Sequence, residues 1–190
     1  GLLGFHSLII ILNLFLINYV NENSDLAFLL FLVALVLINF LIFNFPKAKI
    51  FLGDGGAYFL GAFIAVTTIK TSIANPAISP FYFCILLFYL FFEVFFSFIR
   101  KFYQKKSPVL PDNKHLHMLA FKKISEFFGE NKGNYINSII INSIFAILVL
   151  PSIYFADNSL VCKYWFFSLI LIYTLIYFRL YHLTKNQFDI

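Results

Sequence analysis

The stretch Leu26–Phe43 reads LAFLLFLVALVLINFLIF and decides the fold class, because it contains no charged residue. A helix needs roughly 20 predominantly apolar residues to cross the hydrocarbon core of a bilayer. Lipid offers no partners to backbone N–H and C=O groups, so a spanning segment of this kind is expected to be helical. The alternation of apolar and polar residues that marks a barrel strand is absent. The stretch therefore predicts a transmembrane helix.

Five further apolar stretches have a similar length. They are Leu2–Val20, Ala57–Ala74, Ile78–Ile99, Tyr135–Phe155 and Tyr164–Tyr181. Of the 190 residues, 61% are hydrophobic and 12% are charged, whereas a soluble domain carries roughly 25% charged residues. A chain with so few charged residues cannot cover a soluble fold with polar side chains, so the composition excludes a soluble domain. The sequence predicts a single all-α domain over residues 1–190, a polytopic transmembrane helix bundle with about six spans.

The basic residues are distributed unevenly between the connections. Segments 44–56 and 100–134, together with the tail, hold most of the 14 Lys and Arg residues. By the positive-inside rule, these connections are expected to lie in the cytoplasm. The first residue is Gly1 and not Met, so we expect the chain to begin inside a longer protein.

A glycine-rich turn precedes the third apolar stretch. Residues 51–56 read FLGDGG and place Asp54 among three glycines. These are Gly53, Gly55 and Gly56. Glycines allow backbone N–H groups to approach an anion, and a helix N-terminus favours negative charge. A carboxylate here can hold Mg²⁺, which is shared with substrate phosphates, and Lys47 and Lys49 could reach those phosphates. The alternative is a plain turn in which Asp54 is the helix N-cap.

A second motif lies between the fourth and fifth stretches, where residues 105–117 read KKSPVLPDNKHLH. Two prolines indicate a constrained, non-helical segment. If the backbone is extended, His115 and His117 point the same way. Paired imidazoles beside lysines suit phosphate or sugar contacts, or proton transfer. The alternative is a basic loop attracted to anionic lipid headgroups.

One carboxylate, Glu93, lies inside the fourth apolar stretch. Such a group is costly in a membrane and usually faces a partner or a cavity. Arg100 lies two helical turns further on, roughly 10 Å along the axis, and one expectation is a bridge between the two, by snorkelling or through neighbouring helices. A structural or site-supporting role for Glu93 is favoured over direct chemistry.

Apolar residues recur at helical spacing over residues 116–129. This pattern predicts a helix that lies at the membrane surface. The alternative is a helix that packs against the transmembrane bundle.

Together these motifs resemble polyprenyl-phosphate N-acetylhexosamine-1-phosphate transferases, the WecA/MraY type of glycosyltransferase family 4. Residues 44–56 read NFPKAKIFLGDGG and resemble the signature N-x-P-x-A-x-x-F-[ML]-G-D-x-G-S. Arg100 with residues 107–117 resembles the R…S-P…D…H-x-H loop. Residues 1–4 resemble the end of a third motif, whose acidic part would lie upstream of Gly1. The resemblance covers the C-terminal half of a family member, so the N-terminal half is expected to be missing.

The resemblance implies a reaction and a site. A sugar 1-phosphate, by default N-acetylglucosamine 1-phosphate, would pass from a UDP-sugar to undecaprenyl phosphate, with release of UMP. This would be the first step of a cell-surface glycan pathway such as O-antigen or cell wall synthesis. Asp54 would bind Mg²⁺ or Mn²⁺ and act in catalysis with His115 and His117. The remaining substrate-binding residues would be Lys47, Lys49, Gly53, Gly55, Gly56, Arg100 and Lys114.

The same resemblance implies the partners and the location. The partners would be membrane lipid, polyprenyl phosphate and a UDP-sugar, and no nucleic acid. The protein would lie in the bacterial inner membrane with its active site facing the cytoplasm. Met118 stands where many members have a further histidine, and Ala57 stands where they usually have serine.

Two alternatives belong to other functional classes: a transporter fragment and a non-catalytic membrane scaffold. A transporter would place polar or charged groups within several spans. Here Glu93 and a few asparagines, such as Asn39 and Asn142, are expected to be the intramembrane polar groups. The polar residues gather instead in the two basic loops, which favours the enzyme.

Overall fold

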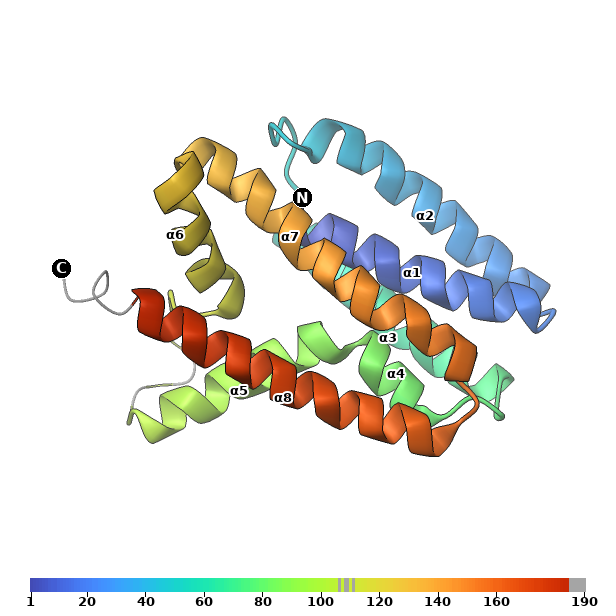
Figure 1. The fold of residues 1–190 in the computed structure, drawn as a ribbon. Coiled ribbons are helices and arrows are strands. Elements are labelled where there is room, and N and C mark those ends of the chain that lie inside the picture. The colour runs from blue at the N-terminus through green and yellow to red at the C-terminus, as the bar shows by residue number, and fades with distance from the viewer. Residues whose placement is uncertain (106, 108–109, 111, 185–190) are drawn as a thin grey trace.

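The computed structural model describes residues 1–105, 107, 110 and 112–184, and every regular element within them is a helix. The helices are drawn in chain order in Figure 1. Their bounds are α1 Leu2–Val20, α2 Ser24–Asn44, α3 Gly53–Ala74, α4 Pro80–Leu86, α5 Phe88–Tyr103, α6 Leu116–Phe128, α7 Glu130–Val149, the 3-10 turn η1 Leu150–Phe155 and α8 Ser159–Thr184. The predicted all-α polytopic bundle is confirmed.

Five of the helices are long and apolar enough to cross a membrane: α1, α2, α3, α7 with η1, and α8. Each contains one of the predicted apolar stretches. Helix α3 begins at Gly53, four residues earlier than predicted, and therefore includes the glycine-rich motif. Helix α7 ends just before Pro151, whose ring is incompatible with a continuing α-helix.

The fourth predicted span, Ile78–Ile99, is wrong as one continuous helix. The structure breaks it at Leu87 into α4 and α5, which are bent by 75° relative to each other. No proline or glycine marks the break, although such residues are the usual cause of a sharp kink. Tertiary contacts hold α5 in its new direction, because the rings of Phe92 and Phe96 pack edge-on against Tyr173 of α8, with centroids 5.0 and 5.4 Å apart.

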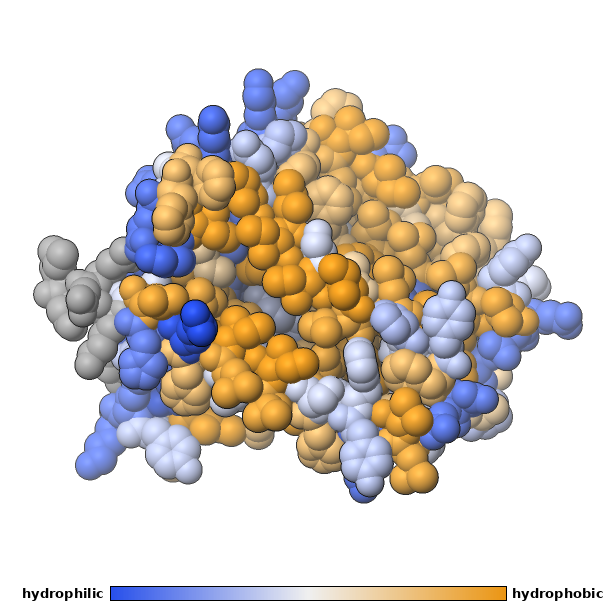
Figure 2. Space-filling view, viewed as in Figure 1, coloured by the Kyte–Doolittle hydropathy of each residue, from blue (hydrophilic) through white to orange (hydrophobic). Residues whose placement is uncertain are grey.

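The surface has the polarity of a membrane protein. Figure 2 shows hydrophobic residues over the middle of the molecule and hydrophilic residues towards the ends of the helices. Helix α2 illustrates this, since Phe28, Val36 and Ile42 are all more than 60% exposed. An apolar belt of this extent is unusual on a soluble monomer, and it supports the assignment of a multi-pass membrane protein.

Helices α1 and α3 run parallel to each other. Near their last turns, the Asn18 side-chain amide donates a hydrogen bond of 2.8 Å to the Thr71 hydroxyl, and just beyond them Asn23 donates to Asn75 at 3.1 Å. Contacts between such polar side chains help to fix helix positions in a membrane. The first residues of α1 and α3 consequently lie towards the opposite end of the bundle, which we call the motif end.

The long connection between α5 and α7 contains the predicted short helix. Helix α6 lies across the motif end in Figure 1, and it packs against α7 and α8. Leu119 is its fully buried residue. Of the two alternatives for residues 116–129, packing against the transmembrane bundle is therefore the one that the structure confirms.

Candidate functional site

Glu93 of α5 organises the site from inside the bundle. Its carboxylate accepts three hydrogen bonds: from His115 Nδ1 at 3.0 Å, from the Leu116 backbone N–H at 2.8 Å and from the Tyr173 hydroxyl at 2.7 Å. A buried carboxylate needs such donors to offset the loss of hydration. The predicted supporting role fits this geometry. Arg100 pairs with Asp112 and not directly with Glu93, because the histidine motif and α8 supply the partners of Glu93.

The two imidazoles of the second motif lie together, with ring centroids 5.6 Å apart and planes inclined by 20°. His115 has an extended backbone and is the N-cap of α6, while His117 already belongs to that helix. The rings therefore converge, although the backbone is not extended through both residues. When His115 Nδ1–H donates to Glu93, its Nε2 is the atom available for substrate.

Burial lowers the pKa of His117, and the neighbouring His115 ring acts in the same direction, while the Glu93 carboxylate opposes them. His117 is therefore more readily neutral than an exposed histidine. A neutral imidazole carries one N–H donor and one acceptor nitrogen. Side by side, the two rings can offer both donors and acceptors to a phosphate or a hydroxyl group.

Arg100 and Asp112 form an ion pair that fixes the loop before the histidines. The Arg100 guanidinium also donates to Ser97 Oγ at 3.1 Å, and the Lys114 backbone N–H donates to Asp112 Oδ1 at 2.9 Å. Burial opposes ionisation of Asp112, but the hydrogen bond and charge of Arg100 outweigh it, so its pKa lies below the usual range. The pair positions the histidine motif, and direct substrate contact by Arg100 stays a prediction.

Helix α8 closes the loop from the other side. The Tyr177 hydroxyl donates to the Lys114 carbonyl at 3.0 Å, and the Lys114 ammonium lies 5.5 Å from the centre of the Tyr181 ring. Substrate binding by Lys114 also stays a prediction. Lys106, Pro108 and Pro111 of the same motif lie outside the described residues.

Asp54 lies in the first turn of α3 at the motif end and is exposed. The N-cap of this helix is Leu52, so the alternative that made Asp54 the N-cap is wrong. Gly53 has a φ of +67°, a conformation that side chains other than glycine rarely adopt. A Cβ at Gly53 or Gly55 would meet nothing within 4 Å, so the backbone here is accessible to a ligand.

The other residues of the first motif surround this turn. Lys47 and Lys49 are exposed, and the connection that carries them is held by the Asn44 side-chain amide, which donates to the Ile50 carbonyl at 2.7 Å. Gly56 packs close to Leu52, since an added Cβ would come within 2.8 Å of that side chain. Phosphate binding by Lys47 and Lys49 stays a prediction.

A cavity of about 350 Å³ opens beside the histidines. Its lining consists of Leu2, Leu3, His6, Tyr89, Leu90, Glu93, Val94, His115 and His117. We call it the histidine cavity. Asp54 is not among the lining residues, and the described part of the chain contains no group of three His, Cys, Asp or Glu side chains that could hold a metal. Both motifs lie at the motif end, while their convergence on one substrate stays a prediction.

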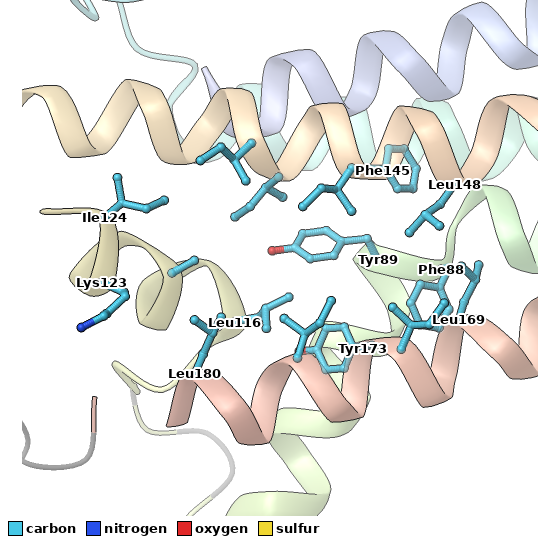
Figure 3. A pocket seen from close by; sticks show the side chains of 16 residues that line it. Phe88, Tyr89, Leu116, Lys123, Ile124, Phe145, Leu148, Leu169, Tyr173 and Leu180 are labelled. Carbon is cyan, nitrogen blue, oxygen red and sulfur yellow. The ribbon is translucent and has the colours of Figure 1, made fainter. Parts of the chain in front are cut away.

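A second cavity of about 310 Å³ lies between α5, α6, α7 and α8. Figure 3 shows its apolar side chains, with the Tyr89 hydroxyl projecting into it and Lys123 at one side. Tyr89 lines both this cavity and the histidine cavity.

Sequence reasoning missed three residues of this region. Tyr173 and Tyr177 are polar only at their tips, so within an apolar stretch they are indistinguishable from packing residues. His6 could have been singled out from the sequence, because it is a histidine inside the first apolar stretch. The expectation that Glu93 and a few asparagines are the intramembrane polar groups is therefore incomplete.

Comparisons with known proteins agree with the motifs. Residues 1–72 match the model of glycosyl transferase family 4. An undecaprenyl-phosphate alpha-N-acetylglucosaminyl 1-phosphate transferase of Thermotoga maritima is 35% identical over 95 residues, which are 50% of this chain and 31% of the relative. A protein of Bacillus subtilis, named "Probable undecaprenyl-phosphate N-acetylglucosaminyl 1-phosphate transferase", is 33% identical over 90 residues, 44% of this chain and 24% of the relative.

The matched stretch thus covers less than a third of either relative. No solved structure matches the chain. The family model covers α1, α2 and nearly all of α3, including the glycine-rich motif. These matches over the first part of the chain, with the motifs in their expected order along an all-α membrane bundle, agree with the resemblance to glycosyl transferase family 4.

Proposed function

We propose that the protein containing this chain transfers N-acetylglucosamine 1-phosphate from a UDP-sugar to undecaprenyl phosphate. The observation that carries the proposal is the histidine cavity, where Glu93 orients His115 beside His117 at the same end of the bundle as Asp54. The two curated relatives are named as transferases that act on undecaprenyl phosphate, which supports the choice of carrier.

In the proposed reaction, a phosphate oxygen of the carrier attacks the β-phosphorus of the UDP-sugar. The bond from that phosphorus to the bridging oxygen breaks, and UMP leaves with the oxygen. All reacting groups are anionic, so catalysis depends on positioning and charge neutralisation. His115 Nε2 can accept the proton of a monoprotonated carrier phosphate, and Glu93 stabilises the imidazolium that results.

Asp54 is the residue of this chain that would hold Mg²⁺ or Mn²⁺. An exposed carboxylate on an open glycine-rich turn fits an ion that binds one or two carboxylates and takes its other ligands from water and phosphates. When bound, the ion would neutralise charge on the phosphates. Lys47 and Lys49, both exposed beside the turn, would add positive charge.

The location follows from the demands of the two substrates. The carrier tail needs lipid and the nucleotide needs water, and a site where helices leave the membrane meets both. We place the motif end on the cytoplasmic side of a bacterial inner membrane, because most Lys and Arg residues lie in the loops at that end. The product would enter a cell-surface glycan pathway as its first lipid-linked intermediate.

The test uses the full-length protein in membranes, with UDP-N-acetylglucosamine, undecaprenyl phosphate and Mg²⁺, and measures UMP. We expect Asp54→Asn to abolish UMP release while membrane insertion survives. Asp25→Asn is the matched control, because Asp25 is also an exposed carboxylate in the first turn of a spanning helix but lies at the opposite end of the bundle.

Near-normal turnover of Asp54→Asn would refute the role of this carboxylate. Absence of UMP release from the unmodified full-length protein, with every sugar donor tried, would instead favour a non-catalytic scaffold or a transporter fragment.

A further inference from the structure

Helix α1 carries a buried histidine that the proposed mechanism leaves unused. His6 exposes 1% of its surface. Neither imidazole nitrogen makes a hydrogen bond of normal geometry within the described part of the chain, although the Asn142 side chain interacts with the ring. The ring packs on Phe145, with centroids 3.8 Å apart, and lies 5.1 Å from the Tyr89 ring. A buried polar group without a well-formed hydrogen bond is costly and points to an occupant that the protein atoms alone do not supply.

His6 borders the histidine cavity together with His115 and His117. Three imidazoles from two separate segments of the chain therefore line one space. The carboxylate of Glu93, which lies in the same cavity, is already engaged by three donors. The hydrogen-bonding capacity left in the cavity comes from imidazole nitrogens and from the Tyr89 hydroxyl, which has no hydrogen-bond partner among the described residues. Neutral imidazoles and a hydroxyl group both donate and accept, so a ligand with several oxygen acceptors and one hydroxyl group, such as a monoprotonated phosphate, fits them.

The remaining walls and the depth of the cavity narrow the choice of ligand further. Leu2, Leu3, Leu90 and Val94 form an apolar lining. His6 lies on a spanning helix, roughly 6 Å along the axis from the first residue of α1 at about 1.5 Å per residue. A ligand that carries oxygen acceptors on an apolar chain matches both features, since its head would face the imidazoles and its chain would lie in lipid.

We propose that His6 is a binding residue for the phosphate head of the lipid carrier, acting from α1 opposite the histidine pair. The proposal rests on the function proposed above for its choice of carrier, but the binding itself is testable without turnover. The His6 N–H donates to a phosphate oxygen of the carrier. The uridine diphosphate part of the UDP-sugar binds elsewhere and does not contact His6.

The variant His6→Phe retains the ring packing against Phe145 and removes both nitrogens. In the full-length protein we expect its KM for undecaprenyl phosphate to rise about 10- to 100-fold, the range for one hydrogen bond to a charged group. The KM for UDP-N-acetylglucosamine should stay unchanged. His6→Gln, which restores a donor, should recover part of the loss. Ser7→Ala is the matched control, because Ser7 is equally buried and unpartnered but does not line the cavity.

A binding measurement separates this proposal from the proposed function. Geranylgeranyl phosphate should raise the melting temperature of the detergent-solubilised protein more than geranylgeraniol does, and His6→Phe should abolish that difference. This result in a protein that releases no UMP would uphold the site and reject the transferase. If the protein is an active transferase and His6→Phe leaves its KM for undecaprenyl phosphate unchanged, the proposed function is upheld and the His6 site is rejected. A rise in the KM for the UDP-sugar alone, or an equal effect of Ser7→Ala, would also overturn the assignment.

Discussion

The contact between Glu93 and His115 offers the sharpest test of the site, through the substitution Glu93→Gln. The amide is nearly isosteric with the carboxylate, and its oxygen can still accept from His115 Nδ1 and from the Leu116 N–H. The Tyr173 hydroxyl, now 2.7 Å from Glu93, can accept from the new amide group. The substitution therefore removes the negative charge while it preserves the hydrogen-bonding pattern.

The magnitude follows from the loss of that charge. Hydrogen bonds with an ionised partner are roughly twice as strong as neutral ones, and a bond to a charged group contributes about 1.5 to 3 kcal/mol. The amide oxygen keeps a neutral hydrogen bond to His115, so the imidazolium loses about half of that stabilisation, about 0.8 to 1.5 kcal/mol. We expect kcat for UMP release to fall by about 4- to 12-fold, which is the equivalent of that loss in the barrier.

Tyr173→Phe is the matched comparison. It removes one of the three donors but leaves the carboxylate charged and bonded to His115 and Leu116. Its loss of kcat should be smaller than that of Glu93→Gln. The assay is UMP release over a range of pH, with melting in detergent as the check on folding. A folded Glu93→Gln protein with wild-type kcat, or a larger loss in Tyr173→Phe, would refute the idea that the charge of Glu93 acts through His115.

Three further predictions concern stability. Asp112→Asn should lower the melting temperature at neutral pH. The pKa of Asp112 is depressed in the fold, so the stability advantage of the wild type should be present above pH 3.8. It should vanish as pH falls through the lower pKa that Asp112 has in the folded state. Thr71→Val removes the 2.8 Å hydrogen bond from Asn18 and should cost about 0.6 to 1.7 kcal/mol, with unchanged KM values because the contact lies opposite the motif end. Asn39→Leu should leave stability equal or improved in a melting assay, since Asn39 is exposed on α2 and bonds within its own helix; a clear loss would mean that this face of α2 contacts another segment.

Much of the fold was predictable because it depends on composition. An apolar run of spanning length must be helical wherever lipid surrounds it, so α1, α2, α3, α7 and α8 could be located from hydropathy alone. The break in the fourth span could not, since Leu87 is as apolar as its neighbours and the bend depends on aromatic contacts between α5 and α8.

The candidate site was likewise predictable from the sequence only in part. Asp54, His115 and His117 stand out in the sequence because charged and polar residues are rare in this chain, and their motifs are contiguous. The partners of Glu93 were not visible, because they lie 22 to 80 residues away along the chain and meet it only after α5 bends and α8 packs beside it. The polarity of a residue can be read at one position of the sequence, whereas a hydrogen bond between helices depends on the relative positions of several helices.

The sequence by itself determined that this protein is a helical membrane bundle with its polar motifs in two basic connections, because the hydrophobic effect acts on each segment separately. Only the tertiary structure decided which partner neutralises Glu93, and that His6 of α1 faces the same cavity as the histidine pair. Those pairings depend on how the helices pack and bend, which no single segment encodes.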